Sequence, residues 1–186
     1  MRAYTKKDFP VADVRRFLEP GPIVLVSSRY KAQTNIMTMG WHMVMEFEPS
    51  RLGCFITTAN HSYELIRRSR ELVINVPEVH MMKTVIGIGN CHGSTKLDKF
   101  RKFDLTAEEG AEVSAPLIKE CYANFECKVV DTSLLRKYGL FILECVKAHV
   151  PAKPKYPKTM HYRGEGVFML SGANVDRHRL FKKQNM

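Results

Sequence analysis

NIMTMGWHMVMEF, residues 35–47, is the stretch that decides the fold class of this chain of 186 residues. Its odd positions from Met37 to Met45 are apolar, and a period of two is the spacing of a β-strand rather than of a helix. The turn-forming residues Glu48-Pro49-Ser50 close the run. We therefore predict a strand over residues 35–47.

Outward from this stretch, further short runs rich in β-branched and aromatic residues predict more strands. They are Pro22–Arg29, Leu52–Thr58, Leu72–Val76, Ala123–Asp131, Leu140–His149 and Gly166–Ser171. Short helices are predicted over residues 62–69, with Ser62 as N-cap, over 78–88, and over one or two turns of 96–103. Strands outnumber helices and do not alternate regularly with them. The pattern favours a mainly β barrel or sandwich over a doubly wound parallel sheet.

Length and composition predict a single domain over residues 1–186, with a core over about 20–172 and a C-terminal tail over 173–186. We expect no membrane association, because no run of about 18 apolar residues is present. The N-terminus lacks the apolar run of a secretory signal, so we expect a cytoplasmic protein. The 5 cysteines form no CxxC pair, which argues against a disulfide framework and a metal site.

The net charge of +10 attracts anions without choosing among nucleic acid, anionic lipid and a phosphorylated small ligand. The basic residues are spread along the chain and do not interleave with aromatic residues as in a single-strand binding groove. A basic nucleic-acid binder is an alternative, but no motif for it is present, so we expect no nucleic-acid partner.

The chain also lacks GxGxxG, GxxxxGK[ST], GxSxG and HExxH, the motifs of common dinucleotide, nucleotide, hydrolase and metalloprotease sites. No catalytic residue of its own is predicted. A bound cofactor that carries the chemistry would fit this absence, and a flavin is such a cofactor.

An ordered series of short stretches resembles the flavin reductase-like FMN-binding family, which includes the flavoredoxins. The series is TNIMTMGWH (34–42), Glu48-Pro49, Cys54–Thr58, NHSYELIRRSRELVINVP (60–77), GSTKLDKF (93–100), Ala115-Pro116-Leu117, ANFECKV (123–129) and His161–Gly164. The resemblance covers about residues 20–172. It implies a Greek-key-like split β-barrel that forms a homodimer, with FMN in a cleft near the subunit interface.

The resemblance also implies cofactor-binding residues. Polar groups at the isoalloxazine edge are expected from Thr34, Asn35 and Thr38, beside Met39 and Gly40, with Trp41 stacking on the flavin or filling the barrel core instead. A strand end and helix N-terminus suit the FMN phosphate, and the residues there are Thr57, Thr58, Asn60, His61 and Ser62. Several family members carry a basic residue at the place of Asn60, which leaves open what neutralises the phosphate here.

Other predicted contacts come from the second half of the chain. Asn90 and Ser94 lie in a polar loop near the flavin, where Cys91 is read as an inert rather than a redox thiol. Lys99 offers a cation to the phosphate or ring edge, or is a surface lysine. Phe168, with His161 and Tyr162, is expected to reach over a flavin.

Two functions follow from the resemblance. The first is an FMN-dependent oxidoreductase or electron carrier that takes hydride or electrons from NAD(P)H or a redox protein and passes them to flavin, a metal ion or a protein. The second is a protein that binds FMN, or another anionic ligand, without redox turnover.

Overall fold

The computed structural model describes residues 4–182; residues 1–3, and residues 183–186 of the predicted tail, lie outside this range. The strands within it are β1 (Lys6–Phe9), β2 (Val24–Tyr30), β3 (Gln33–Met39), β4 (His42–Glu46), β5 (Arg51–Phe55), β6 (Glu71–Val76), β7 (Ala107–Glu108), β8 (Leu117–Ile118), β9 (Ala123–Asp131), β10 (Leu140–Pro151), β11 (Met160–Gly164) and β12 (Val167–Leu170).

The helices between these strands are short. They are the 3₁₀ turns η1 (Val11–Val14), η2 (Val79–Met81) and η3 (His178–Leu180), and the α-helices α1 (Arg15–Leu18), α2 (His61–Ser69), α3 (Met82–Gly89), α4 (Lys99–Lys102) and α5 (Leu135–Tyr138). In the described part of the chain, no helix is long and apolar enough to cross a membrane.

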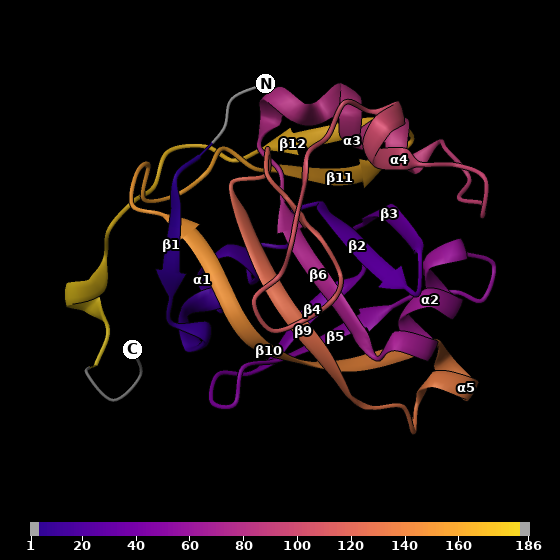
Figure 1. Ribbon diagram of the computed structural model, residues 1–186. Coiled ribbons are helices and arrows are strands. Elements are labelled where there is room, and N and C mark those ends of the chain that lie inside the picture. Colours follow the sequence, from indigo (N-terminus) through magenta and orange to yellow (C-terminus); the bar gives the residue numbers. More distant parts are fainter. Residues whose placement is uncertain (1–3, 183–186) are drawn as a thin grey trace.

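A single antiparallel sheet curls into a barrel that is open along one line (Figure 1). Its strands follow the order β3-β2-β6-β9-β10-β5-β4, with β1 added to β10. The two ends of this path, β3 and β4, are consecutive in sequence, and only Gly40-Trp41 joins them. The barrel is therefore split between β3 and β4, and the chain crosses the split at Gly40-Trp41. The mainly β, split-barrel prediction is confirmed.

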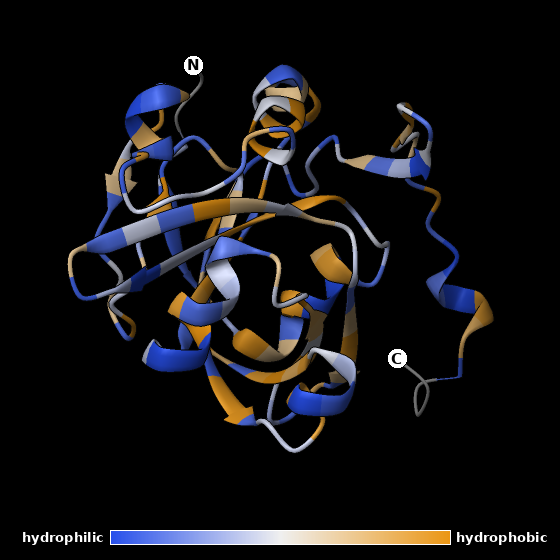
Figure 2. Cartoon of the chain, turned by 90° about the vertical axis from the view of Figure 1, so that its right-hand side faces the viewer, coloured by the Kyte–Doolittle hydropathy of each residue, from blue (hydrophilic) through white to orange (hydrophobic). Residues whose placement is uncertain are grey.

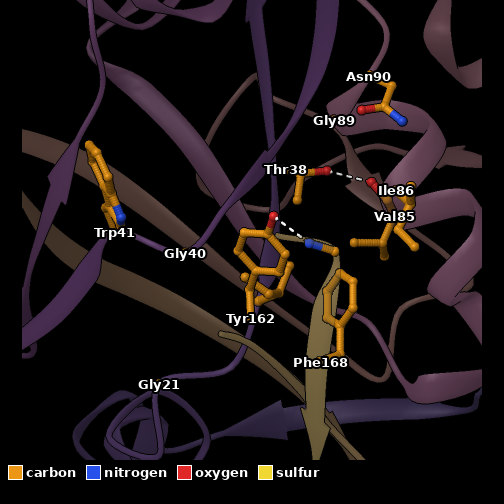
Figure 3. Close-up of a pocket in the computed structure, with 12 residues that line it drawn as sticks. Gly21, Thr38, Gly40, Trp41, Val85, Ile86, Gly89, Asn90, Tyr162 and Phe168 are labelled. Carbon is orange, nitrogen blue, oxygen red and sulfur yellow. Dashed lines mark hydrogen bonds between the residues drawn. The ribbon is translucent and has the colours of Figure 1, made fainter. Parts of the chain in front are cut away.

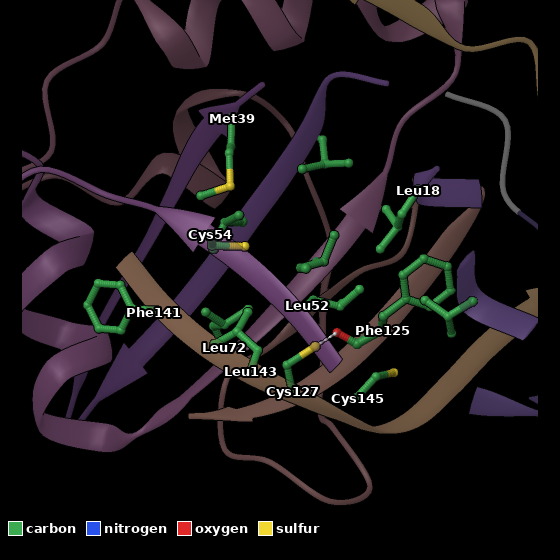
Figure 4. Packing of buried hydrophobic residues seen from close by; sticks show 14 of the residues in the cluster. Leu18, Met39, Leu52, Cys54, Leu72, Phe125, Cys127, Phe141, Leu143 and Cys145 are labelled. Atoms are coloured by element: carbon green, nitrogen blue, oxygen red, sulfur yellow. Dashed lines mark hydrogen bonds between the residues drawn. The ribbon is translucent and has the colours of Figure 1, made fainter. Parts of the chain in front are cut away.

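Alternation along the strands fills the inside of the barrel and covers part of its outside. Val24 and Val26 of β2 belong to the interior core, which Figure 4 shows from close by, whereas Leu25 faces a second cluster under α3. Because both faces of β2 are buried at this point, its first three residues, Val24–Val26, are all apolar. Figure 2 shows hydrophobic stretches along the strands that enclose the interior.

The predicted strand over residues 35–47 is wrong in its continuity, because it is two strands on opposite edges. Before the break, Met37 packs against the interior core; after it, Val44 does so, and the odd-numbered Met43 and Met45 are exposed. Each strand alternates as predicted, but odd-numbered residues face inward before the split and even-numbered residues face inward after it.

The role predicted for Ser62 is also wrong. Helix α2 begins at His61, and its N-cap is Asn60. Ser62 is fully buried and its hydroxyl accepts a hydrogen bond from Asn35 Nδ2 at 2.8 Å. Ser62 therefore ties α2 to β3 instead of capping the helix.

Strands β11 and β12 form a separate hairpin beside α3 (Figure 1). Met160 and Phe168 of this hairpin belong to the cluster under α3. His161 is buried, with Nδ1 3.0 Å from the carbonyl oxygen of Gly21, and His42 Nε2 lies 2.8 Å from that of Pro22. These two histidines hold the Gly21-Pro22 segment in place below the hairpin.

Candidate functional site

Two hollows open on either side of the Gly40-Trp41 connection, and Thr38, Gly40 and Trp41 line both of them. The helix-side groove, of about 240 Å³, is lined in addition by Met37, Met39, Phe55, Thr57 and Asn60. The hairpin-side chamber, of about 500 Å³, is lined in addition by Gly21, Ile23, Val85, Ile86, Gly89, Asn90, Tyr162, Gly166 and Phe168. The split in the barrel is thus also where the molecule is hollowed.

The helix-side groove ends at the N-terminus of α2. Asn60 makes no capping hydrogen bond with its side-chain oxygen, and its Nδ2 donates to Thr57 Oγ1 at 3.2 Å. The first turn of α2 therefore keeps the partial positive charge of a helix N-terminus. An anion is favoured at this end of the groove.

Behind the groove, buried side chains hold β3 and α2 together. Asn35 is buried and donates to Ser62, and the backbone of Gly93 passes so close that a Cβ there would lie 2.9 Å from Asn35 Oδ1 and 2.8 Å from His61 Cβ. The predicted stretches 34–41 and 57–62 are therefore adjacent, as expected. Asn35 and Ser62 support the groove and do not line it.

Lys99 is buried behind the same wall and is not a surface lysine. Its Nζ donates to the carbonyl oxygens of Ile36 at 2.8 Å and Ile88 at 3.4 Å. Burial lowers the pKa of this ammonium. Lys99 thus joins β3 to the end of α3, and it lines neither hollow.

His61 is the first residue of α2, and its Nε2 is buried without a hydrogen-bond partner. Burial lowers the pKa of this imidazole, and the positive charges of Lys99 and His92 lower it further. A bound anion nearby would stabilise the positively charged forms of His61, Lys99 and His92, which disfavour one another.

The hairpin-side chamber has aromatic and aliphatic walls (Figure 3). Tyr162 and Phe168 stand with ring centroids 5.0 Å apart, and the Tyr162 hydroxyl accepts a hydrogen bond from the Gly166 N–H at 3.1 Å. Across the chamber lies Trp41, which is 70% exposed and contacts Phe55 at a centroid distance of 5.1 Å. Trp41 therefore lines the chamber, and the alternative prediction, that it fills the barrel core, is wrong.

One end of the chamber is formed by the C-terminal turn of α3. Asn90 is the C-cap of this helix, and the Thr38 hydroxyl donates to the Val85 carbonyl oxygen at 2.7 Å. A helix C-terminus carries partial negative charge. The two hollows thus face opposite ends of two helices.

The remaining predicted site residues lie around the hollows without lining them. Thr34 is half-buried in the ladder opposite Arg29, Thr58 is exposed in the turn after β5, and Ser94 is exposed in the loop before α4. In the same loop, the half-buried Cys91 accepts a hydrogen bond from Lys102 Nζ at 3.3 Å. Cys54, Cys121, Cys127 and Cys145 are buried, and no metal-binding cluster occurs among residues 4–182.

Sequence reasoning missed most of the chamber wall. The residues absent from the prediction are Met37 and Phe55 in the groove and Gly21, Ile23, Val85, Ile86, Gly89 and Gly166 in the chamber. Val85 and Ile86 carry no separate signal, because apolar residues of a short helix read as core. In the sequence, only the sole tryptophan, Trp41, and the neighbouring Gly40 indicate where the chamber lies.

Comparisons with known proteins agree on one family. The sequence model of the family described as flavin reductase like domain matches residues 15–169. An uncharacterized protein of Archaeoglobus fulgidus is 34% identical over 134 residues, which are 72% of this chain and 75% of that protein.

Solved structures show the same fold. An FMN-binding domain of a flavin reductases-like enzyme from Shewanella baltica superposes with a TM-score of 0.84 at 24% identity, over 95% of this chain and all of that one (100%). A flavoredoxin from Methanosarcina acetivorans gives a TM-score of 0.75, also at 24% identity, over 91% of this chain and 95% of that one.

Proposed function

This chain belongs to the flavin reductase-like domain family, and from that premise we propose that it is an FMN-dependent oxidoreductase. It takes hydride or electrons from NAD(P)H or a redox protein and passes them to a flavin, metal or protein acceptor. The observation that carries the proposal is the cleft between residues 34–41 and 57–62, which ends at the N-terminus of α2, where Asn60 makes no side-chain capping hydrogen bond.

The residues present fit the phosphate end of FMN. The α2 N-terminus offers backbone N–H groups and a favourable dipole, and Thr57 and Asn60 add side-chain donors on the groove wall. Lys99 adds positive potential from behind, and the Nε2 of His61 has no hydrogen-bond partner, so it is available to a bound anion. The helix dipole and the buried Lys99 together replace the basic residue that this chain lacks at position 60.

The residues around Gly40-Trp41 fit the ring end. Trp41 offers an indole face to a flat ring, and Thr38 and the backbone of residues 38–41 offer polar groups to its edge. When bound, FMN supplies hydride and single-electron transfer. The protein's part is to hold the ring at the split, exclude water with Trp41 and the hairpin, and orient the reacting face.

The test is optical. The purified protein is titrated with FMN and with riboflavin, which lacks the phosphate, and the bound flavin is then titrated with NADH, NADPH and reduced ferredoxin under anaerobic conditions. We expect FMN to bind more tightly than riboflavin and its blue absorbance to bleach with at least one donor. A protein that stays colourless in excess FMN would contradict the proposal, and tight binding without bleaching would leave only a binding protein.

We further propose a homodimer formed through the exposed row on the edge strand β4. Met43, Met45 and nearby Phe47 are 47%, 45% and 45% exposed, and an unpaired apolar edge strand is a surface that proteins ordinarily cover. Light scattering should give twice the mass of the chain. Met43→Lys should give the monomer mass, and Leu134→Lys, which changes an exposed residue beside α5, should keep the dimer.

A further inference from the structure

The hairpin-side chamber differs from the helix-side groove in what it can hold. Its aliphatic walls are Ile23, Val85 and Ile86, and its aromatic walls are Trp41, Tyr162 and Phe168. A volume of about 500 Å³ is within the range of pockets that bind small molecules. Flat aromatic walls favour a planar, conjugated occupant.

The residues around the chamber disfavour a charged ligand. None of its lining residues is Asp, Glu, Lys, Arg or His. The nearest helix end is the C-terminus of α3, whose partial negative charge repels anions. Lys99, near that end, donates to the carbonyl oxygens of Ile36 and Ile88. An anion entering the chamber would therefore lose its hydration without gaining a cationic partner.

The polar side chains on the wall specify which neutral group is recognised. The Thr38 hydroxyl already donates its proton to Val85, so it can only accept. Asn90 lies at the rim (Figure 3), and its side-chain amide makes no hydrogen bond to the described residues, so its Nδ2 can donate. An amide donor at the edge of an apolar chamber matches a carbonyl oxygen.

We propose that the hairpin-side chamber binds a small, planar, uncharged carbonyl compound of the quinone class, which accepts electrons from the flavin held at the split. The proposal rests on the proposed function. Reduced FMN, when bound, would supply a hydride, and a quinone that gained this hydride and a proton from water would become a hydroquinone while the flavin would become oxidised. The electrons come from the donor that first reduced the flavin.

The binding test uses two probes of matched size that do not react with thiols, 2-(hydroxymethyl)anthraquinone and anthraquinone-2-carboxylate. Trp41 is the sole tryptophan and lines both hollows, so quenching of its fluorescence reports a bound probe in the flavin-free protein, and the Ile86→Lys variant assigns that probe to the chamber. Calorimetry measures the same binding to FMN-saturated protein. We expect the neutral probe to bind at least about tenfold more tightly than the carboxylate, although the net charge of the chain favours the carboxylate.

A charge placed in the chamber should reverse this preference. Ile86 lines the chamber and is 39% exposed, so Ile86→Lys introduces a cation without burying it. We expect this variant to bind the carboxylate more tightly than the neutral probe. Leu134→Lys makes the same kind of change at a residue that is 40% exposed and outside the chamber, and it should keep the wild-type order.

Three results would overturn the inference: equal or tighter binding of the carboxylate by the wild type, no change of order in Ile86→Lys, or competition between FMN and the neutral probe. Competition would mean that the flavin ring itself fills the chamber. Failure to bind FMN in the same titrations would instead contradict the proposed function, and it is measured separately from probe binding.

Discussion

The helix-side groove and the hairpin-side chamber share Thr38, Gly40 and Trp41 but are built for different chemistry. The groove meets the N-terminus of α2, with His61 and Lys99 behind it; the chamber meets the C-terminus of α3 and has no charged side chain on its wall. Opposite helix ends thus give two adjoining hollows opposite preferences for anions. One short connection, Gly40-Trp41, can thus separate a site suited to phosphate from a site without charged side chains.

The largest expected effect comes from adding a methyl group behind the groove. In Gly93→Ala the new Cβ would lie 2.8 Å from His61 Cβ and 2.9 Å from Asn35 Oδ1. Such overpacking costs about 1–3 kcal/mol of unfolding free energy. We expect that loss in thermal or denaturant unfolding, together with weaker FMN binding.

Gly172→Ala is the matched control, because nothing lies within 4 Å of a Cβ at that position. In Gly93→Ala the neutral anthraquinone should still bind, since the strain is on the groove side. Unchanged FMN affinity in this variant would show that the loop 90–94 does not shape the groove.

The next effect separates helix stability from anion binding. Asp is a good N-cap and interacts favourably with a helix N-terminus, so Asn60→Asp should keep or raise the thermal stability of the protein. The same carboxylate should weaken FMN binding by about tenfold or more, because it faces the phosphate. Riboflavin affinity should stay as in the wild type, and an equal loss for both flavins would remove the phosphate from this end of the groove.

A smaller effect is expected at the wall that both hollows share. Trp41→Leu removes an aromatic face, and aromatic pairs contribute about 0.5–1.5 kcal/mol beyond their buried area. Affinities for FMN and for the neutral anthraquinone should both fall a few fold when measured by calorimetry. Trp41→Phe should restore most of each, and a loss confined to one ligand would show that the indole serves only that side.

The smallest effect concerns pH and His61. Its lowered pKa, caused by burial and then by Lys99 and His92, means that the folded protein binds this proton less readily than the unfolded chain. The free energy of unfolding is therefore not reduced by His61 above pH 6.5, the ordinary pKa of histidine, and it decreases as the pH falls below that value. Thermal unfolding of the flavin-free protein from pH 7.5 to 5.5 should show a smaller loss in His61→Gln than in the wild type. A pH dependence that is the same in His61→Gln and in the wild type would assign the acid sensitivity to other groups.

Sequence alone predicted the strands well, because alternation and turn residues act locally. The ladders of β2, β6, β9 and β10 lie where their β-branched runs predict them. The break at Gly40-Trp41 was missed, since its cause is the curvature of a whole sheet whose two edges meet there. In the same way, Ser62 reads as a helix cap from its neighbours in sequence, but long-range packing against Asn35 buries it.

The candidate site was predictable to a similar extent. The groove came from residues close together in sequence, at a strand end and a helix start. The chamber is assembled from Gly21 and Ile23, the end of α3 and the β11–β12 hairpin, which are distant in sequence and carry no polar signature. Lys99 was predicted to offer a cation to the flavin or to lie on the surface; its burial against two carbonyl groups depends on tertiary packing and has no signal in the sequence.

The two-residue link between β3 and β4 gives the scaffold a point of adjustment. No ladder hydrogen bond joins those two strands, so inserting or deleting a residue there would reshape both cavities while leaving the pairing of every other strand in register. Changes confined to the Gly40-Trp41 link can thus alter which ligands such a barrel binds, with little loss of folding free energy.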